Sequence, residues 1–415
     1  MAKAVIFTLG CKVNEVESAS LARALGEQGY EVSTKLGYAD LYILNTCAVT
    51  AEAEKKSRQL VARALKYNPN ARVLVCGCAA QKNAQVFAAR QNVRAVTGAR
   101  NKSRIPSLLE AAGIFVDDAD KAFDELPLPA AVRTRHFIKI QDGCNNFCSY
   151  CIVPYMRGRS RSRAADSVVA EACAAAERGA EEIVLTGIDI SSYRDGEKGL
   201  AELLGALSSL PARVRLGSLE VRVVNEKLLT AARGMSDFAP HFHLSLQSGS
   251  SAVLRRMNRH YTREEYLERC RMIYEFFPRA AITTDIIAGF PGETEEEFSD
   301  TLSIIDEAAF AQVHCFVYSP REGTPAAALP QLSPEVKEDR RRRLAERAAA
   351  RQAAYVDGFL GQTFSFVPEE QKDGFTFGYT ENYIRVAVRG NVPKRGRIIL
   401  KERKEEYCIG EIDHE

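Results

Sequence analysis

Short apolar runs alternate with helical segments in two consecutive series along this chain, and this alternation restricts the fold more than any other feature. In the first series, strands are predicted at 4–10 (AVIFTLG), 41–47 (LYILNTC), 71–78 (ARVLVCGC) and 94–98 (RAVTG). Between them, apolar residues recur near every 3.6 positions, as in helices. Such alternation is typical of βαβ units on a parallel sheet. Residues 1–115 are therefore predicted to form a small flavodoxin-like α/β domain.

The second series begins after a linker predicted at 116–135, where acidic clusters and two prolines interrupt any period. Its strands are predicted at 136–142, 181–187, 213–220, 241–248, 280–290 and 312–319. Six βα units are fewer than the eight of a complete barrel. Residues 136–350 are therefore expected to form a partial, open (β/α)6 barrel.

The sequence pattern changes again at residues 351–415, where short predicted strands follow one another without helices between them. The runs QTFSFVPEE, GFTFGYT, YIRVAVRG, GRIILKERK and YCIGEID are separated by turn residues. This pattern predicts a small closed or nearly closed β-barrel, an architecture that oligonucleotide-binding modules use.

Composition narrows the cellular setting. The 56 Lys and Arg residues nearly balance the 54 Asp and Glu residues, so contact with nucleic acid has to come from local patches. The segment MAKAVIFTLG lacks the regions of a signal peptide, and no apolar run approaches the length of a membrane span. We expect a cytoplasmic protein whose cysteines are reduced and that does not bind membranes.

The strongest local motif is CNNFCSYC, which places Cys144, Cys148 and Cys151 directly after a predicted strand. Four thiolates normally complete a 4Fe-4S cluster, so three leave one iron open. The amino and carboxylate groups of S-adenosylmethionine (SAM) can chelate such an iron. The alternative is a zinc loop, which needs a fourth ligand, and the nearest histidine, His136, lies on the preceding strand.

A second set of cysteines follows three strands of the first domain. Cys11, Cys47 and Cys78 end neighbouring predicted strands, whose carboxyl ends form the ligand crevice of an open parallel sheet. They are predicted to hold a second 4Fe-4S cluster. Cys76 competes with Cys78 for this role, although it belongs to the apolar run. The remaining cysteines are interpreted as packing residues: Cys173, Cys270, Cys315 and Cys408.

Motifs spread over nearly the whole chain resemble the methylthiotransferase family of radical SAM enzymes. They are TLGCKVNEVES, LYILNTCAVTAEAEKKSRQ, CGCAAQ, KIQDGCNNFCSYCIVPYMRGRSRSR, IVLTGID, LSLQSGS, TDIIAGFPGETEEEF and YSPREGTPA. The resemblance implies an N-terminal domain with an auxiliary cluster, a radical SAM barrel and an RNA-gripping TRAM-like barrel. It also implies that SAM supplies both the methyl group and a 5′-deoxyadenosyl radical, and that a low-potential donor such as flavodoxin or ferredoxin supplies electrons.

The segment after Cys11 distinguishes members of this family. CKVN resembles the bacterial type that acts on threonylcarbamoyladenosine at position 37 of tRNAs reading ANN codons, whereas isopentenyladenosine enzymes usually show CQMN and ribosomal-protein aspartate enzymes CPKN. Both of these substrates remain alternatives. A further alternative is an iron-sulfur sensor or RNA-binding module without catalysis.

Polar groups and glycines at strand ends facing the barrel mouth are the candidates for binding SAM. They are Thr186, Gly187, Glu220, Gln247 and Asp285, followed by Gly289 and Phe290, and the resemblance adds Tyr150 beside the cluster and the adenine. For each strand-end residue taken alone, an ordinary turn role is the competing interpretation.

Two groups of basic residues are candidates for contacting the tRNA anticodon loop. Arg157, Arg159, Arg161 and Arg163 alternate after the three-cysteine loop, and on an extended segment they would share one side. The final barrel combines aromatic and basic residues as single-strand binders do: Phe375, Phe377, Tyr379, Tyr383, Arg385, Arg389, Lys394 and Arg397. A solvated surface or a barrel core is the alternative for each group, and the run Arg340–Arg343 is ambiguous because it lies on a predicted helix.

Overall fold

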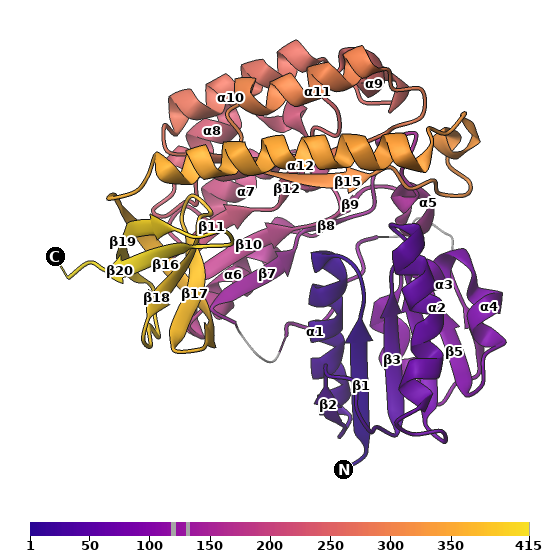
Figure 1. Ribbon diagram of the computed structural model, residues 1–415. Coiled ribbons are helices and arrows are strands. Elements are labelled where there is room, and N and C mark those ends of the chain that lie inside the picture. Colours follow the sequence, from indigo (N-terminus) through magenta and orange to yellow (C-terminus); the bar gives the residue numbers. More distant parts are fainter. Residues whose placement is uncertain (118–121, 130–132, 415) are drawn as a thin grey trace.

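The computed structural model describes residues 1–117, 122–129 and 133–414 and divides them into three sheet-based units (Figure 1). The predicted linker at 116–135 therefore lies partly outside the described residues. No helix among the described residues combines the length and apolar character needed to span a membrane.

The first unit is a six-stranded parallel sheet in the order β2-β1-β3-β4-β5-β6. The strands are β1 (Lys3–Thr8), β2 (Glu31–Ser33), β3 (Leu41–Thr46), β4 (Arg72–Gly77), β5 (Val93–Thr97) and β6 (Gly113–Phe115). The helical segments are α1 (Lys12–Glu27), α2 (Ala51–Leu65), α3 (Cys78–Lys82), α4 (Ala84–Ala88) and the 3-10 helix η1 (Lys102–Leu108). The order of the first five strands is that of flavodoxin-like sheets, as predicted.

The second unit is a partial barrel built from two parallel sheets, β11-β10-β7 and β12-β13-β14-β15. Its strands are β7 (Arg135–Lys139), β10 (Glu182–Thr186), β11 (Arg213–Leu216), β12 (Ser218–Leu219), β13 (His241–Leu244), β14 (Ala281–Ala288) and β15 (Gln312–Val317). The third predicted strand is divided at Gly217 into β11 and β12, which join the two sheets. Six strand positions remain, so the partial (β/α)6 barrel is confirmed.

Helices cover the outside of this barrel (Figure 1). They are α6 (Ala165–Glu177), α7 (Leu200–Ala206), α8 (Glu226–Arg233), α9 (Ser251–Arg256), α10 (Arg263–Phe276) and α11 (Glu295–Glu307), with the 3-10 helices η2 (Ile190–Ser192), η3 (Val221–Val223) and η4 (Pro325–Ala328). After β7, the short pair β8 (Gln141–Asp142) and β9 (Arg161–Ser162) frames the three-cysteine loop and α5 (Val153–Arg157). Capping boxes begin α10 at Thr262 and α11 at Thr294.

Helix α12 (Pro334–Asp357) connects the second unit to the third and runs without interruption past residue 350, where a domain boundary was predicted. Ser333 caps its start and Pro334 occupies its first turn, as the sequence pattern favours. Figure 1 shows α12 lying along the barrel beside β15 and ending at the C-terminal strands.

The third unit is a closed barrel in the order β16-β17-β18-β20-β19, which confirms the predicted small β-barrel. Its strands are β16 (Thr363–Lys372), β17 (Phe375–Thr380), β18 (Arg385–Arg389), β19 (Gly396–Arg403) and β20 (Cys408–Ile412). They alternate buried and exposed residues around a core that includes Phe364, Phe366 and Val386.

Candidate functional site

Three cysteines of the first unit come together at the carboxyl ends of β1, β3 and β4. Cys11 is the N-cap of α1, Cys47 follows β3, and Cys78 is the first residue of α3. Burial raises the pKa of the Cys47 thiol, and the neighbouring Cys78 and Cys11 thiols raise it further. The topology therefore brings these three thiols into one electrostatic environment despite their separation in sequence.

A glycine makes room for this group. Gly10 has a φ of +109°, and a Cβ atom there would lie 2.8 Å from Sγ of Cys47. Any side chain at position 10 would thus be strained and would also occupy the space beside a thiol.

The competing Cys76 lies on the other face of the sheet. Its side chain is fully buried and packs with Ile6, Leu21 and Ile43, whereas Cys78 belongs to the cluster on the opposite face. Burial raises the pKa of Cys76 to about 12. The structure thus favours Cys78 over Cys76 as the third ligand.

The three cysteines of CNNFCSYC lie in the loop between β8 and α5. The backbone N–H of Asn146 donates a hydrogen bond to Sγ of Cys144 at 3.4 Å, and burial raises the pKa of both Cys144 and Cys151 to about 12. Gly143 precedes them with a φ of +73°, and a Cβ atom there would approach the carbonyl oxygen of Arg159 to 2.0 Å. The loop can therefore close against β9 only because position 143 is a glycine.

Two polar residues beside this loop were missed by the sequence analysis. Nη1 of Arg259 lies 3.6 Å from Sγ of Cys148, and Nη2 of the same residue donates to the carbonyl oxygen of Ser245 at 2.6 Å. Asp189 accepts a hydrogen bond from Asn146 at 3.1 Å. Asp189 ends the motif IVLTGID but was not selected as a site residue, and Arg259 reaches the loop from a distant part of the chain that carries none of the quoted motifs.

Glu220, a predicted SAM ligand, lies near Asp189. Burial raises the pKa of Asp189, and the negative charge of Glu220 raises it further. Backbone N–H of Glu220 donates to Ser191 at 2.7 Å, which fixes the turn after β12. The carboxylate of Glu220 thus lies near Asp189 and accepts hydrogen bonds from Arg222 at 3.1 and 3.2 Å.

Gln141 connects this loop to the end of β10. Its side-chain amide donates to the carbonyl oxygen of Gly143 at 2.7 Å, and its side-chain oxygen accepts from the backbone N–H of Ile188 at 3.1 Å and of Asp189 at 2.7 Å. Thr186 and Gly187, two of the predicted SAM contacts, therefore lie directly beside the three-cysteine loop.

A buried network of ion pairs joins the first unit to the barrel. Glu17 of α1 accepts from Nζ of Lys139 at 2.6 Å and from Arg157 at 3.1 Å, and it also pairs with Lys102. Asp142 accepts from Lys139 at 2.6 Å and from Arg157 at 2.9 Å. Although burial alone would raise the pKa of Asp142, Arg157 and Lys139 outweigh it and lower the pKa to about 2.

Two of the four arginines predicted to contact RNA are buried, which corrects that prediction. Arg157 is 1% exposed at the end of α5, and Arg163 is 6% exposed and pairs with Glu171. The segment folds into α5, a turn and β9 rather than one extended strand, so the side chains do not share a side. Arg159 is exposed and lies 4.6 Å from the Phe147 ring centroid, whereas the Arg161 guanidinium is nearly buried beside Asp142.

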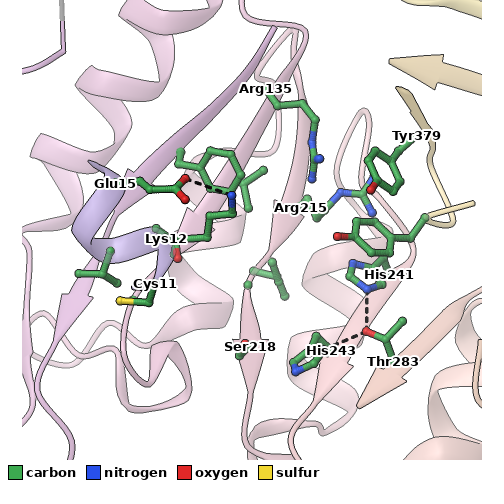
Figure 2. Close-up of a pocket in the computed structure, with 18 of the residues that line it drawn as sticks. Cys11, Lys12, Glu15, Arg135, Arg215, Ser218, His241, His243, Thr283 and Tyr379 are labelled. Carbon is green, nitrogen blue, oxygen red and sulfur yellow. Dashed lines mark hydrogen bonds and ion pairs between the residues drawn. The ribbon is translucent and has the colours of Figure 1, made fainter. Parts of the chain in front are cut away.

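A cavity of about 1040 Å³ brings the three units together, as Figure 2 shows. The first unit contributes Cys11 and Lys12, the barrel contributes its inward-facing strand residues, and the third unit contributes Tyr379 and Tyr383. Thr186 and Gly187 line this cavity. One continuous space thus extends from a predicted auxiliary cluster ligand to the C-terminal barrel.

Two histidines and an aspartate lie together on the strands of the barrel. Potential ligand atoms of His243, Asp285 and His314 all lie within 4.8 Å of one another, and both histidines line the cavity. Thr283 interacts with Nδ1 of His243 at 3.0 Å (Figure 2). Nε2 of His243 lies 3.5 Å from the carboxylate of Asp285. The sequence analysis selected Asp285 but missed His243 and His314. A signal existed for His243, because the alternation in HFHL places it on the same face of the strand as His241.

The remaining predicted SAM contacts have different environments. Gln247 follows β13 with a φ of +75°, and its backbone bridges β14 through Asp285 and Ile287. Tyr150 is partly buried against a cluster that includes Phe290. Phe290 itself is fully buried and the Cα of Gly289 faces Lys337, so neither of these two lies open to a ligand.

The C-terminal barrel closes one end of the cavity with stacked rings. His241 stacks on Tyr383 with ring centroids 4.0 Å apart, and Tyr383 stacks on Tyr379 at 4.7 Å. Two arginines of the barrel, Arg135 and Arg215, lie over the Tyr383 ring. Tyr379 and Tyr383 therefore line the cavity, and both also line a second pocket beside Arg385.

Three buried arginines of the partial barrel pair with one carboxylate, that of Glu182, at the end of the cavity where the C-terminal barrel packs. Glu182 pairs with Arg135 at 2.7 Å, Arg215 at 2.8 Å and Arg213 at 3.8 Å. Arg135 also reaches Glu369 at 2.6 Å in the C-terminal barrel. Burial alone would raise the pKa of Glu182, but these arginines outweigh it and lower the pKa to about 2.

The other predicted RNA contacts of the C-terminal barrel lie at its surface. Arg385 and Arg389 are exposed at the two ends of β18, and Arg385 lies 5.4 Å from the Phe377 ring centroid. Lys394 is exposed as well, whereas Arg397 pairs with Asp413 at 3.0 Å. In the ambiguous run on α12, Arg340 is buried against Glu293, and Arg341–Arg343 pair with acidic neighbours.

Comparisons with known proteins agree with this arrangement. Residues 3–98 match a group described as uncharacterized protein family UPF0004, and residues 138–305 match the Radical SAM superfamily. A threonylcarbamoyladenosine tRNA methylthiotransferase, MtaB, of Bacillus subtilis is 35% identical over 419 residues, which cover 96% of this chain and 93% of the relative. A tRNA-2-methylthio-N(6)-dimethylallyladenosine synthase of Alkaliphilus oremlandii is 38% identical, with 88% and 82% covered.

Solved structures support the fold alone. The radical SAM methyltransferase TsrM of Kitasatospora setae, determined with cobalamin and a [4Fe-4S] cluster, superposes with a TM-score of 0.58 at 14% identity. The match covers 79% of this chain and 77% of that one.

Proposed function

Because the chain belongs to the radical SAM methylthiotransferase family, we propose that it transfers a methylthio group to C-2 of threonylcarbamoyladenosine at position 37 of ANN-decoding tRNAs. The observation that carries this proposal is the cavity shared by the three units, which extends from Cys11 of the N-terminal sheet to Thr186 and Gly187 at the end of β10. A reaction that uses two cofactor sites on one base needs both to open onto one space.

The two groups of three cysteines are suited to bind two iron-sulfur clusters. Cys144, Cys148 and Cys151 would hold one cluster, and Cys11, Cys47 and Cys78 would hold the other, each set leaving one iron without a protein ligand. When bound, the first cluster with SAM supplies a 5′-deoxyadenosyl radical, and the auxiliary cluster supplies the sulfur that is methylated and transferred.

The protein's own residues arrange these sites. Gln141 fixes the three-cysteine loop against the end of β10, where Thr186 and Gly187 are proposed to contact SAM together with Glu220, Gln247, Asp285 and Tyr150. The buried network of Glu17, Asp142, Lys139 and Arg157 then holds the N-terminal sheet against this end of the barrel.

The lining of the cavity supports the choice of substrate. Sequence identity does not separate the two kinds of tRNA enzyme, since relatives of both kinds are 34–38% identical to this chain. The cavity wall, however, carries charged and hydrogen-bonding groups such as Lys12, His243, His314 and Thr283. A threonylcarbamoyl group has a carboxylate, a hydroxyl and amides to match them, whereas a dimethylallyl group is a hydrocarbon that offers them no hydrogen-bonding group.

The RNA itself is proposed to contact the exterior of the C-terminal barrel. Arg385 and Arg389 are exposed and are suited to phosphate groups of the anticodon loop. Arg159, beside the three-cysteine loop, is a further candidate. A flavodoxin or ferredoxin is proposed as electron donor, and the cytoplasm as the location, because tRNA substrates and reductants of this kind are found there.

Two experiments test the proposal. Nucleoside mass spectrometry of tRNA from a strain that lacks this protein should show threonylcarbamoyladenosine without its methylthio derivative, and the derivative should return on complementation. Persistence of the derivative in the deletion strain would refute the tRNA assignment and favour another substrate, such as a ribosomal-protein aspartate.

Anaerobic reconstitution with iron, sulfide, SAM and dithionite addresses the alternative of a sensor without catalysis. The reconstituted protein should form 5′-deoxyadenosine, and a variant lacking Cys144, Cys148 and Cys151 should not. Failure of the wild-type protein to cleave SAM under these conditions would refute the assignment as an enzyme.

A further inference from the structure

Lys12 directly follows a predicted ligand of the auxiliary cluster and lies on the wall of the three-unit cavity. It is the first residue of α1, immediately after Cys11, and 57% of its side chain is exposed. Its Nζ atom lies 5.2 Å from the ring centroid of Phe137, which lines the same cavity. Lys12 thus lies on the cavity wall, directly beside Cys11 (Figure 2).

Of the three arginines that line the cavity, which are Arg133, Arg135 and Arg215, the last two are already committed to contacts within the protein. Arg215 donates to both carboxylate oxygens of Glu182 at 2.8 Å and to two backbone carbonyl groups of the C-terminal barrel. Arg135 pairs with Glu182 and Glu369. If either guanidinium turned toward a ligand, the fully buried carboxylate of Glu182 would lose one of the positive charges that offset its desolvation.

Lys12 has no such commitment. Its partner is Glu15, three residues along α1, with Nζ and Oε2 3.1 Å apart and the Glu15 side chain 47% exposed. An exposed pair of this kind contributes little to stability and is easily exchanged for another anion. The flexible four-carbon stem lets the ammonium turn toward a ligand without movement of the backbone.

We propose that Lys12 determines the specificity of the enzyme by binding the carboxylate of the threonylcarbamoyl group, which replaces Glu15 as its partner. This inference rests on the proposed function. The carboxylate is the one charged group of the modification, and a dimethylallyl group offers no equivalent to it. A lysine that reaches into the cavity from the residue after Cys11 would select the charged modification at the place where the base must lie for sulfur transfer.

The test compares two RNA ligands that differ in this charge and in one methyl group. One is a fluorescent anticodon stem-loop with threonylcarbamoyladenosine at position 37, and the other carries the same group as its methyl ester. Fluorescence anisotropy measures the dissociation constants of both for the reconstituted holoenzyme without reductant. The variants are Lys12→Met, which keeps the length without the charge, Lys12→Arg, which keeps the charge, and Lys56→Met as a control on an exposed helix ion pair outside the cavity.

The wild-type protein, Lys12→Arg and Lys56→Met should bind the acid about tenfold or more tightly than the ester, because a hydrogen bond to a charged group is lost with the ester. Lys12→Met should bind the two equally, at the affinity of the wild-type protein for the ester. Iron content of each variant reports whether the neighbouring site is intact.

An unchanged preference for the acid in Lys12→Met would overturn the assignment to Lys12, as would equal binding of acid and ester by the wild-type protein. Turnover separates this failure from that of the proposed function. If the wild-type protein methylthiolates the acid stem-loop while Lys12→Met keeps its preference, only the inference about Lys12 falls. If the wild-type protein methylthiolates a dimethylallyladenosine stem-loop and not the acid, both fall.

Discussion

The guanidinium of Arg157 in the barrel lies against the thiol of Cys78 in the N-terminal sheet. Burial raises the pKa of Cys78, while the charge of Arg157 and its hydrogen bond to the thiol oppose that rise. The same guanidinium pairs with Asp142, two residues before Cys144. The Arg157 side chain therefore contacts Cys78 of one cysteine set and Asp142, which lies next to the loop of the other set. This shared contact keeps the two cysteine sites, which lie on different domains, in a fixed position relative to each other.

The first prediction concerns the choice between Cys78 and Cys76. Cys78→Ala should lower the iron content of the reconstituted protein from about eight to about four atoms per chain, because one cluster is lost. Cys76→Ala should keep the full content, since its thiol faces the opposite side of the sheet. Iron analysis with electron paramagnetic resonance checks both, and full iron content in Cys78→Ala would contradict the assignment.

Replacing all three of Cys11, Cys47 and Cys78 with Ala should likewise leave about four irons per chain. Cleavage of SAM should continue, because the three-cysteine loop is built by other residues. Loss of all iron in this variant would mean that the two sites do not form independently.

Gly143→Ala should disrupt the three-cysteine loop selectively. The added methyl group would meet the carbonyl oxygen of Arg159 on a backbone with positive φ, so the loop has to shift away from β9. We expect loss of 5′-deoxyadenosine formation and of about four irons, with the auxiliary set retained. Gly196→Ala is a matched control, because Gly196 also has positive φ but nothing within 4 Å of its Cβ position. Normal SAM cleavage by Gly143→Ala would show that the loop tolerates the shift.

Arg157→Gln should destabilise the protein by about 3–5 kcal/mol, because Glu17 and Asp142 would lose a shared cation in a buried site. Chemical denaturation followed by circular dichroism measures the change. Arg342→Gln, on the exposed face of α12, should leave stability nearly unchanged. Equal stabilities for the two variants would mean that the network contributes nothing to the native state.

Glu182 should make stability depend on pH. Its pKa is about 2 in the folded protein against an ordinary value of 4.5, so its stabilising effect is complete above pH 4.5 and is lost as the pH falls from there toward 2. Glu182→Gln should therefore be less stable than the wild-type protein by about 3 kcal/mol at pH 7. The difference should shrink below pH 4.5 in urea unfolding experiments. A difference that stays constant between pH 7 and pH 3 would exclude this carboxylate as its cause.

The sequence predicted those parts of the molecule that depend on local patterns. Strand and helix alternation indicated the two parallel-sheet units and the closed barrel, because each apolar run is confined to one element. The convergence of Cys11, Cys47 and Cys78 also followed from strand order. Short edge strands such as β2 and β6 were missed, since three residues carry too little pattern.

Long-range contacts were the main source of error. Arg157 looked like a surface cation because its burial depends on Glu17, 140 residues away, and on the docking of two domains. Arg259 reaches Cys148 from a turn after α9, and His314 joins His243 only once β15 has paired with β14. No local signal in the sequence marks these contacts.

The uninterrupted course of α12 has a mechanical consequence. Its 24 residues span about 36 Å, and its last turns are fastened to the C-terminal barrel through Tyr355 with Asn382 and Asp357 with Arg403. A helix of this length resists bending, so the C-terminal barrel is held in a constant position against the cavity that its residues Tyr379 and Tyr383 help to line.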